Sequence, residues 1–78
     1  MNKSEAIKRL TAVFRKVFDD DSIVLSDNTS ALDIEGWDSF EHVNLMLSVE
    51  EEFGVHISME QATAIKNVGE LVNILVHD

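Results

Sequence analysis

The first eighteen residues carry apolar side chains at the spacing of an amphipathic helix. Four of them recur every three or four positions: Ile7, Leu10, Phe14 and Val17. This spacing predicts a helix over residues 3–18 that buries one face. Asn2 or Ser4 can cap its start, and Glu5 precedes Arg9 by one turn, so that the two side chains can pair. We expect the basic side chains of this helix to form a solvated face.

Residues 19–37 have no helical periodicity and are rich in acids. Loops of this length are uncommon in compact domains unless they are held in place. Six apolar residues can anchor this one: Ile23, Val24, Leu25, Leu32, Ile34 and Trp37. We therefore expect an ordered loop that is fixed to a helical core and can include one short turn.

Three further helices are predicted from their start and stop signals. Asp38 with Glu41 fits a capping box at the start of the second helix, and Gly54 is a natural stop for it. Its apolar residues lie on more than one side: Phe40, Val43, Leu45, Met46, Leu47, Val49 and Phe53. Two more capping boxes open a brief helix over residues 59–64 and a last helix: Ser58 with Gln61, and Asn67 with Glu70.

These elements predict an all-α fold, namely a small four-helix bundle of three longer helices and one short one, with a long ordered first loop. The last helix contributes Val68, Leu71, Val72 and Leu75 to the core. We expect residues 1–78 to form one domain, as the length suggests. Because the first helix begins directly after Met1, a free-standing protein is expected rather than an excised domain.

The charges are distributed unevenly along the chain. There are 15 Asp and Glu against 6 Lys and Arg, a formal net charge of -9, and Lys66 is the only base after residue 16. Such a surface repels nucleic acid and anionic lipid and suits partners with basic patches, although acidity also keeps a small domain soluble. With no Cys and no apolar run of membrane-spanning length, we expect a soluble, cytoplasmic monomer without membrane insertion.

The stretch Gly-Trp-Asp-Ser-Phe at residues 36–40 opens the second helix. A serine at such a position is most often a helix cap. Here Asp38 already supplies the cap, and Gly36 with the preceding loop leaves Ser39 approachable. The helix also displays three glutamates at residues 50–52 with no base among them. A phosphodiester on Ser39 would lie against free backbone N–H groups at the positive end of the helix dipole.

These residues resemble those of the acyl carrier proteins, whose attachment site is an Asp-Ser-Leu triplet at the start of the second of four helices. The triplet here is Asp38-Ser39-Phe40. The other matches extend into the last helix: Val43, Leu45, Glu-Glu-Glu-Phe-Gly at residues 50–54, Ile57, Ile65 and Val68. The resemblance covers essentially the whole chain, including the long first loop.

The resemblance implies a carrier with no catalytic activity of its own and no metal site. A separate phosphopantetheinyl transferase would move 4'-phosphopantetheine from coenzyme A to the Ser39 hydroxyl, and Asp38 would help to engage that transferase and its magnesium ion. The thiol of the arm would hold acyl intermediates as thioesters for fatty acid, polyketide or related specialised biosynthesis.

The resemblance also assigns a docking surface for acyl-handling enzymes that carry basic patches. Its apolar contacts would be Phe40, Leu47 and Ile57, and its charges Glu41, Glu50 and Glu51. In such families the acyl chain can fold back into the bundle. The candidate walls are Leu45, Met46, Val49, Ala62 and Leu71, which ordinary core packing explains equally well.

Three departures from the family pattern leave the pathway open. Phe40 replaces the usual Leu, Asn44 stands where many relatives have an acid, and the bulky Trp37 is more common in carriers of specialised pathways. A peptidyl or aminoacyl carrier is the closest alternative, and the surplus acid on the second helix favours an acyl or polyketide carrier over it. An unmodified acidic helical interaction module is the more distant alternative.

An enzyme fits these residues less well. Asp38, Ser39 and His42 are close in sequence, but nucleophilic catalysis needs an oriented base and a separate oxyanion site. No Gly-x-Ser-x-Gly elbow is present. We interpret the histidines, His42, His56 and His77, as surface residues.

Calcium binding is also disfavoured by the pattern. The acids at residues 19–21, together with Asp27 and Asp33, resemble a ligand cluster. An EF-hand loop that started at the first of them would place Ile23 and Val24 at its fifth and sixth positions, where an oxygen ligand and a glycine are required.

The acidic surplus generates a prediction about stability. Repulsion among the acids should be screened by salt, so the melting temperature of the unmodified protein should rise between low and moderate ionic strength. Thermal unfolding followed by circular dichroism in increasing sodium chloride measures this, and a melting temperature that stays flat would contradict it.

Overall fold

The computed structural model describes residues 1–76, which form helices joined by ordered loops. In chain order the elements are α1 (Lys3–Val17), the 3₁₀ turn η1 (Ala31–Asp33), α2 (Ser39–Phe53), α3 (Met59–Ala64) and α4 (Val68–Val76). The predicted all-α fold with three longer helices and one short one is confirmed. The short turn lies inside the first loop, residues 18–38. Within residues 1–76, no helix is long and apolar enough to cross a membrane.

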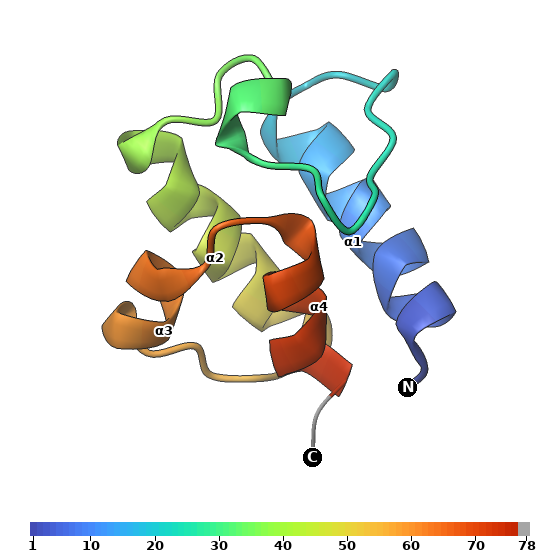
Figure 1. Cartoon of the computed structure of the whole chain (residues 1–78), viewed down its shortest axis with the longest axis vertical. Helices are drawn as coiled ribbons and strands as arrows, with labels where there is room; N and C mark the ends of the chain where they lie inside the picture. Colours follow the sequence, from blue (N-terminus) through green and yellow to red (C-terminus); the bar gives the residue numbers. More distant parts are fainter. Residues whose placement is uncertain (77–78) are drawn as a thin grey trace.

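Helix α1 packs against both α2 and α4. Figure 1 shows these three helices around one core, with α3 on the side away from α1 and the first loop arching over the end of the bundle opposite the chain termini. The largest fully buried side chains are Leu10, Phe14, Leu45, Val49, Val68, Leu71 and Val72. They come from α1, α2 and α4 only, so α3 covers the core without supplying its centre.

The helix ends follow local signals, but of the three predicted capping boxes only Ser58–Gln61 is complete; at α4 the Glu70 carboxylate accepts the Lys66 N–H at 2.8 Å and not that of Asn67. Four side chains accept a backbone N–H at a helix start: Asn2 from Glu5, Asp38 from Glu41, Ser58 from Gln61 and Asn67 from Glu70, at 2.8, 2.8, 3.0 and 2.9 Å. The Gln61 side chain also accepts the Ser58 N–H, which completes that capping box. At the end of α2, Gly54 has φ +65°, a left-handed conformation that glycine adopts without steric cost.

The basic face of α1 differs from the prediction. Arg9 does not pair with Glu5; its guanidinium donates to the carboxylate and the carbonyl of Glu52 (3.0 and 2.6 Å) and lies 4.5 Å from the centre of the Phe53 ring. Packing with α2 offers Arg9 three contacts, whereas an exposed pair within one helix is worth only a few tenths of a kcal/mol, about 0.3–0.5. Three bases of α1, namely Lys3, Arg9 and Arg15, therefore contact other segments and are not simply solvated.

The first loop is ordered and anchored as predicted, but by fewer residues. Ile23, Leu25, Ile34 and Trp37 are buried. Val24 and Leu32 are 79% and 98% exposed, so the prediction that they anchor the loop is wrong. Successive side chains of an extended segment point to opposite sides, which turns Val24 outward because its two neighbours point inward. The prediction missed Thr29, whose buried hydroxyl accepts the Ser26 N–H at 2.9 Å.

The first loop is fixed to α4 by its backbone. The first N–H groups of a helix have no partner within the helix, and here two of them donate to loop carbonyls: Val68 to Thr29 (2.8 Å) and Gly69 to Asp27 (2.9 Å). A Cβ atom at residue 69 would lie only 2.9 Å from the Asp27 carbonyl oxygen. Glycine is therefore required for this close approach.

This approach generates a prediction for Gly69→Ala. The added methyl should push the loop from α4 and lower the free energy of unfolding by about 1–2 kcal/mol, because the overpacking cost of about 1–3 kcal/mol exceeds the helix-propensity gain of at most about 1 kcal/mol. Urea unfolding measures the change. The control is Asn73→Ala on the exposed side of α4, which should stay within about 0.5 kcal/mol of the wild type. Equal stability of Gly69→Ala and wild type would refute the close contact.

Candidate functional site

A tight turn delivers the chain to the start of α2. Gly36 has φ +92°, and the Asp38 N–H donates to the Gly36 carbonyl at 3.0 Å. Between them, the Trp37 side chain turns into the core and is only 7% exposed. The buried indole fixes the chain on one side of Ser39, and the long helix fixes it on the other.

Ser39 is the first residue of α2, and its side chain is exposed. The cap comes from Asp38, whose carboxylate accepts the Glu41 N–H at 2.8 Å. Glu41 does not reach back to complete the predicted capping box; its carboxylate accepts an N–H of the Asn44 amide at 2.8 Å. Because Asp38 performs the capping, the Ser39 hydroxyl stands at the positive end of a 15-residue helix without being needed there.

An apolar groove of about 500 Å³ begins at Ser39 and runs between α2 and α3. We call it the α2–α3 groove. Apolar side chains supply most of its walls: Trp37, Val43, Met46, Leu47, Ile57, Met59, Ala62 and Ile65. Two of the five predicted cargo walls, Met46 and Ala62, line this groove. The other three are fully buried in the core and do not line it: Leu45, Val49 and Leu71.

His42 lines the same groove and is not the surface residue that was predicted. The Trp37 Nε1–H donates to His42 Nδ1 at 2.9 Å, and His42 Nε2 lies 2.8 Å from the Ala62 carbonyl oxygen. An indole nitrogen can only donate, so Nδ1 accepts and Nε2 carries the hydrogen that binds Ala62. We call these two hydrogen bonds the histidine bridge. No local sequence signal indicates this bridge, because Ala62 is twenty residues away from His42.

The predicted docking residues of α2 lie largely at the surface. Phe40 is 77% and Leu47 is 58% exposed, and Val43, which the prediction did not include, is 54% exposed. These three follow one another at helical spacing and so form one apolar stripe. Glu51 is exposed and Glu41 is half-buried. Val43 could have been identified as a docking residue from its sequence position, because it lies three residues after Phe40 and four before Leu47.

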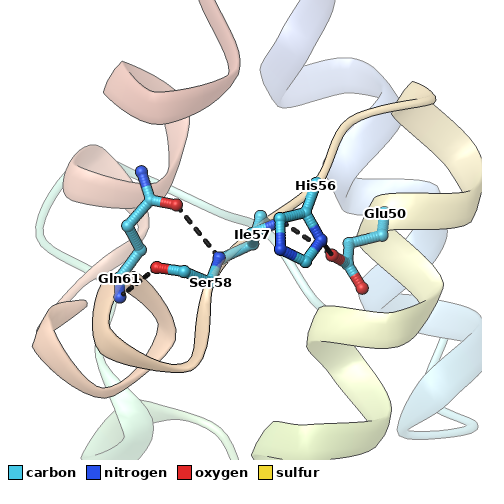
Figure 2. A network of polar contacts seen from close by, with 5 residues as sticks. All are labelled: Glu50, His56, Ile57, Ser58 and Gln61. Carbon is cyan, nitrogen blue, oxygen red and sulfur yellow. Dashed lines mark hydrogen bonds and ion pairs between the residues drawn. The ribbon is translucent and has the colours of Figure 1, made fainter.

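Glu50 and Ile57 also have structural contacts (Figure 2). Glu50 Oε2 accepts the Ile57 N–H at 2.7 Å and lies 3.1 Å from His56 Nδ1, while the exposed fraction of the Glu50 side chain is 22%. Ile57 is 6% exposed. The carboxylate therefore holds the linker between α2 and α3, next to the Ser58–Gln61 capping box that begins α3.

The acids of the first loop make local contacts. The hydroxyl and the N–H of Ser22 donate to Asp20 at 2.6 and 2.9 Å, and these bonds lower the pKa of Asp20 below its ordinary value of 3.8. Among residues 1–76, no group of three or more His, Asp or Glu is placed to hold a metal ion. The predicted surface position of His56 agrees with its 87% exposure, whereas His77 lies outside the described residues.

Comparison with known proteins identifies the family. Residues 8–75 match the family model described as "Phosphopantetheine attachment site". Acyl carrier proteins of Rickettsia canadensis and Rickettsia felis are 32% identical over 68 residues, which cover 87% of this chain and 78% of theirs. The solution structure of the holo acyl carrier protein from Geobacter metallireducens superposes with a TM-score of 0.84 at 44% identity, over 90% of this chain and 80% of that one. The chain therefore belongs to the acyl carrier protein family, whose cofactor is a covalently attached phosphopantetheine.

Proposed function

We propose that this chain carries acyl intermediates as thioesters on a 4'-phosphopantetheine attached to Ser39, for fatty acid, polyketide or related specialised biosynthesis. The observation that carries the proposal is the exposed Ser39 at the first position of a 15-residue helix whose cap is a different residue. A serine that is neither buried nor needed for capping is available for modification.

The residues around Ser39 fit a phosphate-linked arm. The N-terminus of α2 offers backbone N–H groups and a positive dipole to the phosphodiester. The α2–α3 groove begins beside the serine and offers apolar walls to an arm or its cargo. When bound, the arm supplies a thiol that holds an acyl group as a thioester.

Asp38 would act in two ways. Its Oδ1 is engaged with the Glu41 N–H and thereby fixes the first turn of α2. Its carboxylate also borders the groove next to Ser39, where it would engage the transferase and the magnesium ion that accompanies coenzyme A. The transferase joins the Ser39 oxygen to the phosphorus of the arm, and the Ser39 proton and the nucleotide half of coenzyme A are released.

The docking surface would combine the apolar stripe of α2 with its acids. Phe40, Val43 and Leu47 expose more than half of their side chains, and apolar side chains of this kind supply binding energy when a partner covers them. Glu41 and Glu51 would attract basic patches on acyl-handling enzymes and accelerate their association. The surplus acid on α2 favours acyl or polyketide cargo over a peptidyl carrier.

Glu50 and Ile57 would contribute to docking by position more than by direct contact. The Glu50 carboxylate is committed to the linker, and the Ile57 side chain is buried. Both residues line the α2–α3 groove, so they would shape the surface that a partner meets.

The proposal is tested by intact mass after incubation with coenzyme A, magnesium and a broad-specificity phosphopantetheinyl transferase. The wild type should gain the mass of one phosphopantetheine, and Ser39→Ala should gain none. Circular dichroism should show that Ser39→Ala is folded, since an exposed side chain is replaced and stability should change by no more than about 0.5 kcal/mol. Ser4→Ala, an exposed serine near the start of α1, is the matched control and should be modified normally. Absence of the gain in folded wild type would reject the proposal.

A second experiment separates the two roles assigned to the glutamates. Glu50→Ala and Glu51→Ala each remove one negative charge from α2, so they control for one another. Glu50→Ala should lower the free energy of unfolding by about 1.5–3 kcal/mol, because the buried Ile57 N–H loses a charged acceptor. Glu51→Ala should keep its stability but raise the KM of the transferase reaction. Urea unfolding and the rate of modification measure the two effects.

The opposite result for this pair would be informative. If Glu51→Ala were destabilised and Glu50→Ala were not, the linker contact of Glu50 would carry no stability. If Glu51→Ala left the KM unchanged, Glu51 would have no part in binding the transferase.

A further inference from the structure

The histidine bridge forms part of the wall of the α2–α3 groove. Its three members come from three separate segments: Trp37 from the first loop, His42 from α2 and Ala62 from α3. All three line the groove. The two rings are nearly parallel, at 15°, with centroids 6.0 Å apart, so the indole and the imidazole together form one flat wall.

Each polar group in this wall is satisfied by another. The indole N–H has His42 Nδ1 as its acceptor, and the imidazole N–H has the Ala62 carbonyl. Helix α3 has only six residues, so the Ala62 carbonyl is among those that lack a partner within the helix. Opening the wall would leave a buried donor and a helix-end acceptor without partners, and unpaired groups of this kind are costly.

The core lies directly behind the wall. Trp37 packs edge-on against the fully buried Phe14 ring at 5.3 Å between centroids and also contacts Phe18 at 6.3 Å. The buried face of α2 continues through Leu45 and Val49, neither of which reaches the groove. A group that enters the groove beside Ser39 therefore meets Met46, Ile57 and the histidine bridge, whereas the fully buried Leu45 and Val49 lie beyond the groove lining.

We propose that His42 determines which cargo this chain shelters, by keeping the acyl group in the open α2–α3 groove and out of the bundle core. The inference rests on the proposed function, because the cargo reaches the groove only from an arm on Ser39. Cargo that fits the groove of about 500 Å³ is shielded along its length. The distal part of a longer saturated chain stays in solvent, since the bridge blocks its way inward.

The experiment uses the full chain loaded from acyl-coenzyme A by the transferase with straight saturated chains of increasing length. Methyl resonances of Leu45 and Leu71 report on the core, and the indole N–H resonance of Trp37, the single tryptophan, reports on the bridge. In the wild type, acyl chains longer than the groove should leave the resonances of Leu45, Leu71 and Trp37 unchanged. In His42→Ala, the core methyl shifts should grow with chain length, and hydroxylamine should cleave long-chain thioesters several-fold more slowly than in the wild type.

Two variants distinguish the effect of the hydrogen bonds in the histidine bridge from the effect of side-chain volume alone. His42→Gln retains one acceptor and one donor on a single side chain, so it should keep the downfield indole resonance and behave as the wild type. His56→Ala replaces the exposed histidine of the α2–α3 linker and should not admit cargo to the core. If His42→Ala failed to fold, core methyl shifts that grow with chain length in the wild type or in folded His42→Gln would still overturn the inference.

Wild-type core methyl shifts that grow with chain length as in His42→Ala would overturn the inference and leave the proposed function intact. Core methyl shifts that grow with chain length in His42→Gln, while its indole hydrogen bond is retained, would also overturn the inference. Failure of any chain to load on Ser39, seen by intact mass, would instead reject the proposed function, and the inference with it.

Discussion

The packing of the Trp37 indole is the contact on which both the fold and the site depend. It packs against the rings of Phe14 on α1 and of Phe18 directly after α1, and so anchors the end of the first loop. Its N–H binds His42, which in turn binds α3. Because Trp37 lies two residues before Ser39, the same buried ring fixes where α2 begins and where its exposed serine stands. One aromatic side chain thus aligns the first loop, α1, α2 and α3.

The charges divide between stability and recognition. Basic residues of α1 meet acids of other elements, as in Lys3 with Asp27 (2.7 Å) and Arg9 with Glu52 (3.0 Å). Such exposed pairs are worth little on their own, about 0–1 kcal/mol, but they place the few bases at sites where acids would otherwise repel one another. The outer face of α2 near Ser39 receives none of these bases. Its acidity therefore persists in the folded protein as a feature that a basic partner can use.

The helices could be predicted from sequence because their signals are local. The apolar spacing of α1, the Ser58–Gln61 capping box and Gly54 each act within one or two turns. The contacts that shape the site are not local: His42 with Ala62, Glu50 with Ile57, and Arg9 with Glu52. A histidine, a glutamate and an arginine on helix surfaces give the same sequence pattern whether they face solvent or a neighbouring element. Ser39 was recognisable because both its capping neighbour and its family motif lie in adjacent positions.

The size of the domain explains why space for cargo lies at the surface. An enclosed core cavity as large as the groove, about 500 Å³, would cost about 12 kcal/mol at about 24 cal/mol per Å³ of cavity. That is comparable with the whole free energy of unfolding of a typical domain, about 5–15 kcal/mol, and a 78-residue chain has a limited core with which to offset it. An open groove avoids this cost because water fills it when cargo is absent. The groove beside Ser39 can thus stay ready for cargo without an empty cavity in the core, and under our proposal the histidine bridge keeps a bound chain in that groove.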